Sequence, residues 1–202
     1  MINYPTKKCL HKQATSTFNQ RGMRLEKDIN DSNTYYLSVD RALIYKKPTP
    51  VQIVRVEYPK RQASKIVEAY YQTPSTTDYN GLYRGRYIDF EAKETKSKTA
   101  FSFKNIHAHQ IEHLKSVQEH QGIAFLIIRF CAYSETYVVD ASIIIEAYVK
   151  ADRKSISYQD IKQYGNLVEE AYTPRLKYLD SVDALYFEED AHEIKNKPEA
   201  NK

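Results

Sequence analysis

Residues 75–96, STTDYNGLYRGRYIDFEAKETK, constrain the fold of this 202-residue chain more than any other stretch. In the second half of this stretch, Asp89, Glu91 and Lys93 alternate with apolar residues. Successive side chains of a β-strand point to opposite faces. The alternation therefore predicts a half-buried strand that carries a row of charged groups on one face.

A two-residue turn ending at Gly85 would fold the stretch into an antiparallel hairpin. Asp78 would then lie opposite Glu91, and Thr76 would lie opposite Lys93. Two facing carboxylates destabilise a sheet unless something neutralises them, and a bound cation would do so. Two carboxylates together with a hydroxyl oxygen suit Mg²⁺ or Mn²⁺ rather than zinc.

Other registers remain open for this hairpin. The Asn80-Gly81 pair is the stronger turn signal, and a turn there would separate Asp78 from the second carboxylate. A three-residue loop would leave the two carboxylates diagonal to each other. The turn at Gly85 is favoured because it keeps Pro74 outside the strand. An ordinary hairpin with solvated charges on its outer face also fits the spacing.

Asp78, followed after the hairpin by Glu91-Ala92-Lys93, resembles the PD-(D/E)XK signature of restriction-endonuclease-like nucleases, with Thr77 in place of the usual proline. Residues 21–187 also closely resemble the RecU family of Holliday-junction resolvases. The motifs that carry this resemblance are, in order, KKPTPVQIV, YPKR, EAYY, PSTTDYNG, YIDFEAKETKSKT and HQIEH. The resemblance implies that the Mg²⁺ ligands are Thr76, Asp78, Glu91 and Gln110. It also implies that Lys93 stabilises the transition state.

The same resemblance implies an α/β fold with a restriction-endonuclease-like core, in which helices flank a mixed central sheet. It implies one nuclease domain over residues 21–187, with a protruding stalk inserted at about residues 47–75. Such a protein would resolve four-way DNA junctions by Mg²⁺-dependent phosphodiester hydrolysis, with one or two metal ions per site. Paired symmetric nicks require two identical sites, which predicts a two-fold homodimer.

Other functions remain open on this fold. One is a non-catalytic junction-binding protein or a regulator of the strand-exchange recombinase. Another is a nuclease that cuts ordinary duplexes. The recombinase and the branch-migration machinery are further candidate partners.

Composition indicates a globular chain, with 42% hydrophobic and 28% charged residues. The longest apolar run, residues 123–128, is too short to span a membrane, and no signal peptide opens the chain. A cytoplasmic protein without a membrane partner is therefore expected. Cys9 and Cys131 have no metal-ligand spacing and are expected to be reduced thiols. Residues 1–20 predict a flexible basic arm, and residues 188–202 predict a disordered acidic tail.

Basic side chains gather in the predicted stalk. Between residues 41 and 65, seven Lys and Arg residues accompany one acidic residue, Glu57. Such a segment suits the phosphates of several junction arms, although a solvated charged edge of the core is the alternative. The residues predicted to contact DNA are Arg21, Lys46, Lys47, Arg55, Lys60, Arg61, Lys65, Tyr70, Lys96 and Lys98.

Two predicted amphipathic helices carry candidate site residues. On the helix over residues 24–36, Glu26 is either a first-turn acid favoured by the helix dipole or an additional acidic group beside the metal. On the helix over residues 105–121, Gln110 lies on the apolar stripe, where a polar group needs a partner. It is either at the edge of that stripe or a ligand of the metal or its water. His109 and His113 on this helix have zinc-ligand spacing, but no third ligand is evident.

The remaining segments predict an alternation of strands and helices. The near-continuous apolar run at residues 123–131 predicts a central strand covered on both faces. Further strands are predicted at residues 41–47, 51–58 and 135–139, and further helices at 62–72, 141–149, 157–164 and from 180.

Overall fold

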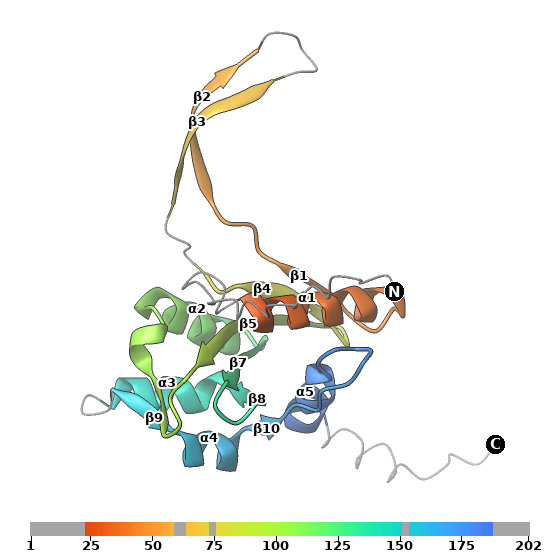
Figure 1. Cartoon of the computed structure of the whole chain (residues 1–202), viewed down its shortest axis with the longest axis vertical. Coiled ribbons are helices and arrows are strands. Elements are labelled where there is room, and N and C mark those ends of the chain that lie inside the picture. Colours follow the sequence, from red (N-terminus) through yellow and green to blue (C-terminus); the bar gives the residue numbers. More distant parts are fainter. Residues whose placement is uncertain (1–22, 59–63, 73–75, 151–153, 188–202) are drawn as a thin grey trace, which may run out of the picture.

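The computed structural model describes residues 23–58, 64–72, 76–150 and 154–187, so the predicted arm and acidic tail lie outside the described residues. Within these ranges the body is a six-stranded mixed sheet with helices on both faces, and a two-stranded hairpin projects from it (Figure 1). The predicted α/β fold, with a mixed central sheet, flanking helices and a protruding insertion, is confirmed.

The elements alternate along the chain much as the sequence predicts. The helices of the described ranges are α1 (Met23–Ser38), α2 (Ala108–Glu119), α3 (Ala141–Val149), α4 (Tyr158–Tyr164) and α5 (Tyr178–Tyr186), with a 3₁₀ turn at Phe103–Asn105. The strands are β1 (Leu43–Lys46), β2 (Val51–Glu57), β3 (Lys65–Tyr71), β4 (Tyr79–Tyr83), β5 (Arg86–Thr95), β6 (Ala100–Ser102), β7 (Ile123–Phe130), β8 (Glu135–Asp140), β9 (Ser155–Ser157) and β10 (Asn166–Leu167).

The main sheet has the strand order β1-β4-β5-β7-β8-β10. Strands β5 and β7 run parallel, paired from Ile88↔Ile123 to Thr95↔Phe130, and the other neighbours are antiparallel. The connection from β5 to β7 passes through β6, the 3₁₀ turn and α2. Strands β5 and β7 therefore lie at the centre of the sheet, where both faces can be covered.

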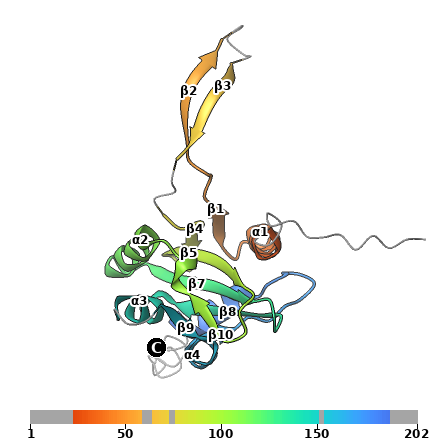
Figure 2. The same cartoon turned by 60° about the vertical axis from the view of Figure 1, so that its left-hand side comes forward.

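Two apolar cores lie on the two faces of this sheet. On one face, α1 and α5 pack over β5 and β7, and the rings of Phe90 and Phe125 stack with centroids 4.7 Å apart. On the other face lie α2, α3 and α4; Figure 2 shows α2 and α3 on the side of the sheet away from α1. Every residue of β7 is buried, which confirms the predicted central strand.

The projecting hairpin, here called the stalk, is the two-stranded sheet β2–β3 (Figure 1). The predicted helix over residues 62–72 is wrong, because β3 pairs antiparallel with β2 from Val51↔Tyr71 to Glu57↔Lys65. Nearly every side chain of both strands is exposed. With no core to impose a helical apolar stripe, the β-branched and aromatic residues of β3 follow their strand preference and their partner strand.

Smaller differences occur at element ends. Helix α2 begins at Ala108 rather than near residue 105, because the chain first makes the 3₁₀ turn. The short strands β6, β9 and β10 were not predicted, since two or three residues carry no periodic signal. Helix α4 begins after Ser157, whose hydroxyl accepts from the Asp160 N–H as expected for an N-cap. In the part of the chain that the structure describes, no helix is long and apolar enough to cross a membrane.

Candidate active site

The β4–β5 hairpin turns at Arg84 and Gly85, which have φ angles of 48° and 77°. The predicted turn at Gly85 is confirmed. The left-handed conformation is unfavourable for an arginine, and tertiary contacts offset that cost. The Arg84 guanidinium lies 3.0 Å from the Asp183 carboxylate and 4.3 Å from the centroid of the Phe187 ring.

The Asn-Gly pair is not a turn, because Gly81 lies inside β4 beside the edge strand β1. A Cβ atom at this position would lie 2.0 Å from the carbonyl oxygen of Leu43. Glycine here allows the close approach of two backbones.

The pairing register brings Asp78 to Glu91, as predicted. Asp78 directly precedes β4, and its backbone N–H donates to Glu91 Oε2 at 3.0 Å. The prediction that Thr76 lies opposite Lys93 is wrong, because Thr76 lies in a bend outside the β4–β5 ladder. The chain enters β4 only at Tyr79, after its return from the stalk.

The charged face of β5 is buried rather than solvated. The predicted half-buried strand is wrong in this respect, since Asp89 and Glu91 are both 0% exposed. The strand lies between β4 and β7, and α2 packs across it. A carboxylate in such a place is costly unless it is hydrogen-bonded or paired with a cation.

The two carboxylate oxygens of Glu91 have different partners. Oε2 accepts from the Asp78 N–H at 3.0 Å, and the buried Oε1 pairs with the Lys93 ammonium, whose Nζ lies 2.5 Å away. Burial raises the pKa of the Glu91 carboxyl to about 7; the Lys93 ammonium lowers this pKa and the Asp78 carboxylate raises it. The site therefore favours a proton or a bound cation on Glu91.

These groups fit a hard divalent cation. The buried Oε1 of Glu91 and the neighbouring Asp78 carboxylate are the charged oxygen ligands that Mg²⁺ and Mn²⁺ prefer. Among the described residues, no group of three or more His, Cys, Asp and Glu side chains could hold a metal ion. Further ligands from the described residues would therefore be neutral oxygens, the kind predicted at Thr76 and Gln110.

Gln110 and Thr76, the two predicted neutral ligands, differ in burial. Gln110 is buried in the first turn of α2, and its Oε1 accepts from the His107 backbone N–H at 3.0 Å. Because Gln110 faces inward, its side chain is expected to need a hydrogen-bond partner. That partner is the backbone N–H at the start of α2. Thr76 is half-buried, two residues before Asp78. The roles of both as metal ligands stay predictions.

Glu26 lies in the first turn of α1 and forms an ion pair with Lys46 at 2.6 Å. The hydroxyl of Tyr79 lies 3.4 Å from the Glu26 carbonyl oxygen. Burial raises the pKa of Tyr79, and the charges of Glu26, Asp78 and Glu91 raise it further. Glu26 is therefore within electrostatic reach of the site carboxylates, a position compatible with both interpretations of this residue.

Asp89 is a buried polar residue that sequence reasoning left without a role. It precedes Glu91 by two residues and so shares its face of β5. Spacing alone cannot separate such a residue from a solvated charge, because burial depends on what covers the strand. The groups around its carboxylate are Lys47, Thr77, Tyr87 and His113.

The zinc alternative has no support in the described residues. His113 faces Asp89, whereas the ring of His109 stacks on His107 with centroids 5.3 Å apart. The two histidines thus have different partners, and the described chain has no metal-binding group of the required kind.

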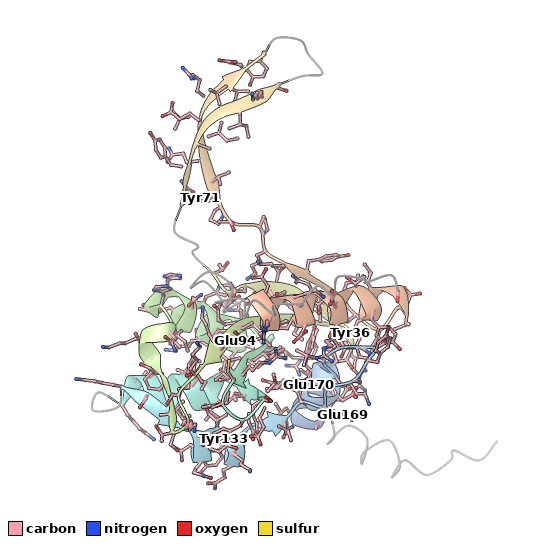
Figure 3. The ribbon with its side chains drawn as sticks, viewed as in Figure 1. Tyr36, Tyr71, Glu94, Tyr133, Glu169 and Glu170 are labelled. Carbon is pink, nitrogen blue, oxygen red and sulfur yellow. The ribbon has the colours of Figure 1, made fainter. Side chains whose placement is uncertain are left out.

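The predicted DNA-contacting residues of the stalk are solvent-exposed where they are described. Arg55 and Lys65 are exposed on β2 and β3, and Tyr70 is 60% exposed. Figure 3 shows Tyr71 on the stalk, away from the body, and this residue is 84% exposed. A protrusion with exposed cations and aromatic rings suits contact with nucleic acid.

The other predicted DNA-contacting residues lie at the stalk base or beyond β5. Lys96 and Lys98 are exposed directly after β5. Lys46 is half exposed in its pair with Glu26, whereas the Lys47 ammonium is turned inward to Asp89. The residues outside the described ranges are Arg21, Lys60 and Arg61.

Comparison with known proteins gives a consistent set of matches. The family model described as "RecU: Recombination protein U" matches residues 20–184. A protein of Bacillus cytotoxicus named Holliday junction resolvase RecU is 50% identical, covering 92% of this chain and 98% of its own. Proteins of the same name from Shouchella clausii and Geobacillus thermodenitrificans are 53% and 55% identical, covering 88% and 83% of this chain and 86% and 85% of their own. The solved Holliday junction resolvase Hjc of Archaeoglobus fulgidus aligns with a TM-score of 0.42 and 11% identity, over 71% of this chain and 93% of Hjc, a likeness too low to bear on function.

Proposed function

Because this chain belongs to the RecU family, we propose that it is a structure-selective endonuclease that resolves Holliday junctions in homologous recombination and DNA repair. The observation that carries the proposal is the Glu91 carboxylate, buried on the central strand with the Asp78 N–H on one oxygen and the Lys93 ammonium on the other. A protein that only binds junctions has no need of this costly arrangement.

Asp78 and Glu91 would hold a divalent cation, Mg²⁺ with Mn²⁺ as the alternative, and Thr76 and Gln110 would complete its ligands. When bound, such an ion lowers the pKa of a coordinated water and neutralises charge on the scissile phosphate. Lys93 extends from the same face of β5 as Glu91 and already pairs with it at 2.5 Å. Its ammonium would orient the attacking water or offset the negative charge that develops in the transition state.

The stalk would provide the selectivity that a metal and two carboxylates lack. These groups hydrolyse any phosphodiester that is brought to them, so the branch must be recognised elsewhere. The stalk projects from the body with Arg55, Lys65 and Tyr70 exposed (Figure 1). In the open centre of a junction it would meet phosphates from several arms at once.

The assembly would be a two-fold homodimer on a four-way junction, because symmetric nicks on two strands need two identical sites. Sedimentation of the full chain at micromolar concentration, alone and with junction DNA, tests this part. A monomer that cuts both strands equally well would contradict it. The strand-exchange recombinase and the branch-migration machinery are candidate partners, and the cytoplasm is the proposed location.

A cleavage assay tests the proposed activity directly. A four-way junction, the matching duplex and a single strand are each incubated with the full chain in Mg²⁺, in Ca²⁺ and in EDTA. We expect cutting of the junction in Mg²⁺ alone, while Ca²⁺ allows binding with little cleavage because its looser geometry suits the chemistry poorly. Full activity in EDTA, or equal cutting of all three substrates, would contradict the proposal.

A further inference from the structure

Asp89 is a buried carboxylate that the reaction described above does not use. It is 0% exposed, and both of its oxygens have partners. Oδ1 accepts from the Thr77 hydroxyl, and Oδ2 accepts from Lys47 Nζ and Tyr87 Oη, each at 2.7 Å. His113 Nε2 lies 3.1 Å from Oδ2. We call these five residues the stalk-base network.

Two members of the stalk-base network lie at the two ends of the stalk. Lys47 directly follows β1, where the chain leaves the sheet, and Thr77 lies where the chain returns before β4. The two ends are also joined directly, since the Lys47 N–H donates to the Asp78 carbonyl at 2.8 Å and Lys47 Nζ donates to Thr77 Oγ1 at 3.0 Å. Asp89 thus holds the entry and the exit of the stalk at once.

The other members connect this point to the catalytic strand and its covering helix. Asp89 and Tyr87 belong to β5, the strand that carries Glu91 two residues further on, and His113 belongs to α2. A displacement of Asp89 therefore moves the strand segment on which the proposed metal ligand lies. Asp78 follows Thr77 directly, so the same displacement reaches both site carboxylates.

Stability alone gives little reason for a charged network here. Buried ion pairs recover only part of the cost of removing charges from water, and apolar groups of the same volume are often as stable. A fully hydrogen-bonded carboxylate fixes the relative positions of its partners, because each partner must meet a particular oxygen at a particular angle. Four partners from the stalk ends, β5 and α2 leave the stalk base with one orientation relative to Glu91.

We propose that Asp89 is a positioning residue that fixes the base of the stalk to the catalytic strand, so that DNA held by the stalk presents one particular phosphate to Glu91. This inference rests on the proposed function, since it assumes cleavage at Asp78 and Glu91 and recognition by the stalk. In this scheme Asp89 touches neither the DNA nor the cation. Asp89 fixes the position of the stalk base relative to Glu91. Lys47 pairs with Asp89 inside the protein and does not bind a DNA phosphate.

Asp89→Asn tests the proposal by the place of the cut as well as by its rate. The full chain is incubated in excess over end-labelled four-way junction, and single-turnover rates and nick positions are read at nucleotide resolution. Junction affinity is measured separately in Ca²⁺. We expect nicks that spread to neighbouring phosphates and a cleavage rate lower by about 10- to 100-fold, the scale of a small misplacement of the reacting groups. Affinity should stay within about threefold, because the phosphate contacts remain. A merely structural role would lower the rate through a smaller active fraction and leave nick positions unchanged, which would overturn the proposal.

Two matched variants at Thr77 provide a second test in case Asp89→Asn does not fold. Thr77→Val removes only the hydroxyl that donates to Asp89, whereas Thr77→Ser keeps it. We expect Thr77→Val to spread the nicks and Thr77→Ser to retain the wild-type pattern. Both variants should stay folded, with a lower melting temperature for Thr77→Val because it removes the hydroxyl that donates to Asp89 Oδ1. If the two variants cut at identical positions, the proposal is overturned.

Glu91→Gln separates this inference from the proposed function. If Glu91→Gln abolishes cleavage but Asp89→Asn and Thr77→Val leave the nick positions unchanged, only the positioning role fails. If Glu91→Gln retains cleavage, the proposed active site fails first.

Discussion

The strands of the stalk and those of the body differ in how far their side chains are buried. In β5, Asp89 and Glu91 are buried with the apolar residues beside them, whereas in β2 nearly every side chain is exposed. Packing from two faces and two neighbouring strands decides the place of each side chain in β5. In the stalk, only cross-strand pairing decides where each side chain lies. A chain can therefore change the surface of its stalk without repacking the core on which the chemistry depends.

The stalk keeps its place through its base rather than through its own core. An isolated two-stranded hairpin is only marginally stable in water. Here the hairpin is closed by the Gln72 N–H, which donates to the Pro50 carbonyl at 3.0 Å, and its ends are held by the stalk-base network. Binding on the stalk and chemistry in the body should consequently respond to different mutations.

The largest expected effect comes from the site carboxylates in the body. Asp78→Asn or Glu91→Gln should lower junction cleavage by roughly 100- to 1,000-fold, the scale of losing one preorganised charged group from a reaction site. Junction affinity in Ca²⁺ should stay within about threefold, because the Lys and Arg side chains that meet phosphates are unchanged. Single-turnover cleavage and gel-shift titration measure the two effects. Glu112→Gln, an exposed carboxylate of α2, is the control, and retained cleavage in the site variants would refute the assignment.

Removing positive charge from the stalk should instead weaken junction binding. Arg55→Ala together with Lys65→Ala should weaken junction binding about tenfold and reduce the salt slope of binding by about two, one for each lost phosphate contact. Titrations at several salt concentrations measure both quantities. Lys150→Gln together with Lys154→Gln provides a charge-matched control near α3 and β9, on the part of the body away from the stalk (Figure 1). An equal loss in the control, or a loss confined to duplex binding, would place branch recognition elsewhere.

Glu91→Gln should also stabilise the metal-free protein at alkaline pH. Burial raises the pKa of Glu91 to about 7, above its ordinary value, so the folded state binds more protons than the unfolded state between about pH 4.5 and 7. Stability conferred by the wild-type residue therefore falls as pH rises through this window. We expect the variant to exceed wild type by about 1–3 kcal/mol in free energy of unfolding at pH 8 in EDTA, and by little near pH 4.5. Urea unfolding at the two pH values measures this, and a gain that does not depend on pH would contradict it.

The smallest expected effect is that of removing the stalk on the stability of the body. Replacing residues 51–71 by an Asn-Gly link between Pro50 and Gln72 uses ends that the structure already joins by a hydrogen bond. The melting temperature should change by less than roughly 3 °C, because the excised strands bury almost no core surface. Calorimetry measures the change. A much larger drop would show that the stalk and the body fold as one unit.

The catalytic hairpin shows how far local signals reach. The turn at Gly85, and with it the approach of Asp78 to Glu91, could be predicted because Pro74 has to lie outside the strand, although turn chemistry alone favoured Asn80-Gly81. Local signals misled in β3, whose residues fit a helix as well as a strand. Only pairing with β2 decides between the two, and β2 is a separate segment of the chain.

By itself, the sequence determined the central strand β7, the helices α1, α3 and α4, and the presence of Asp78, Glu91 and Lys93 around one hairpin. Long apolar runs, regular periodicity and capping residues are strong local determinants of such elements. Only the tertiary structure decided that the charged face of β5 is buried and that Asp89 joins the stalk ends to the catalytic strand. The physical reason is that burial and hydrogen-bond partners depend on which distant elements cover a strand. Here those elements are α2 and the two ends of an insertion about thirty residues long.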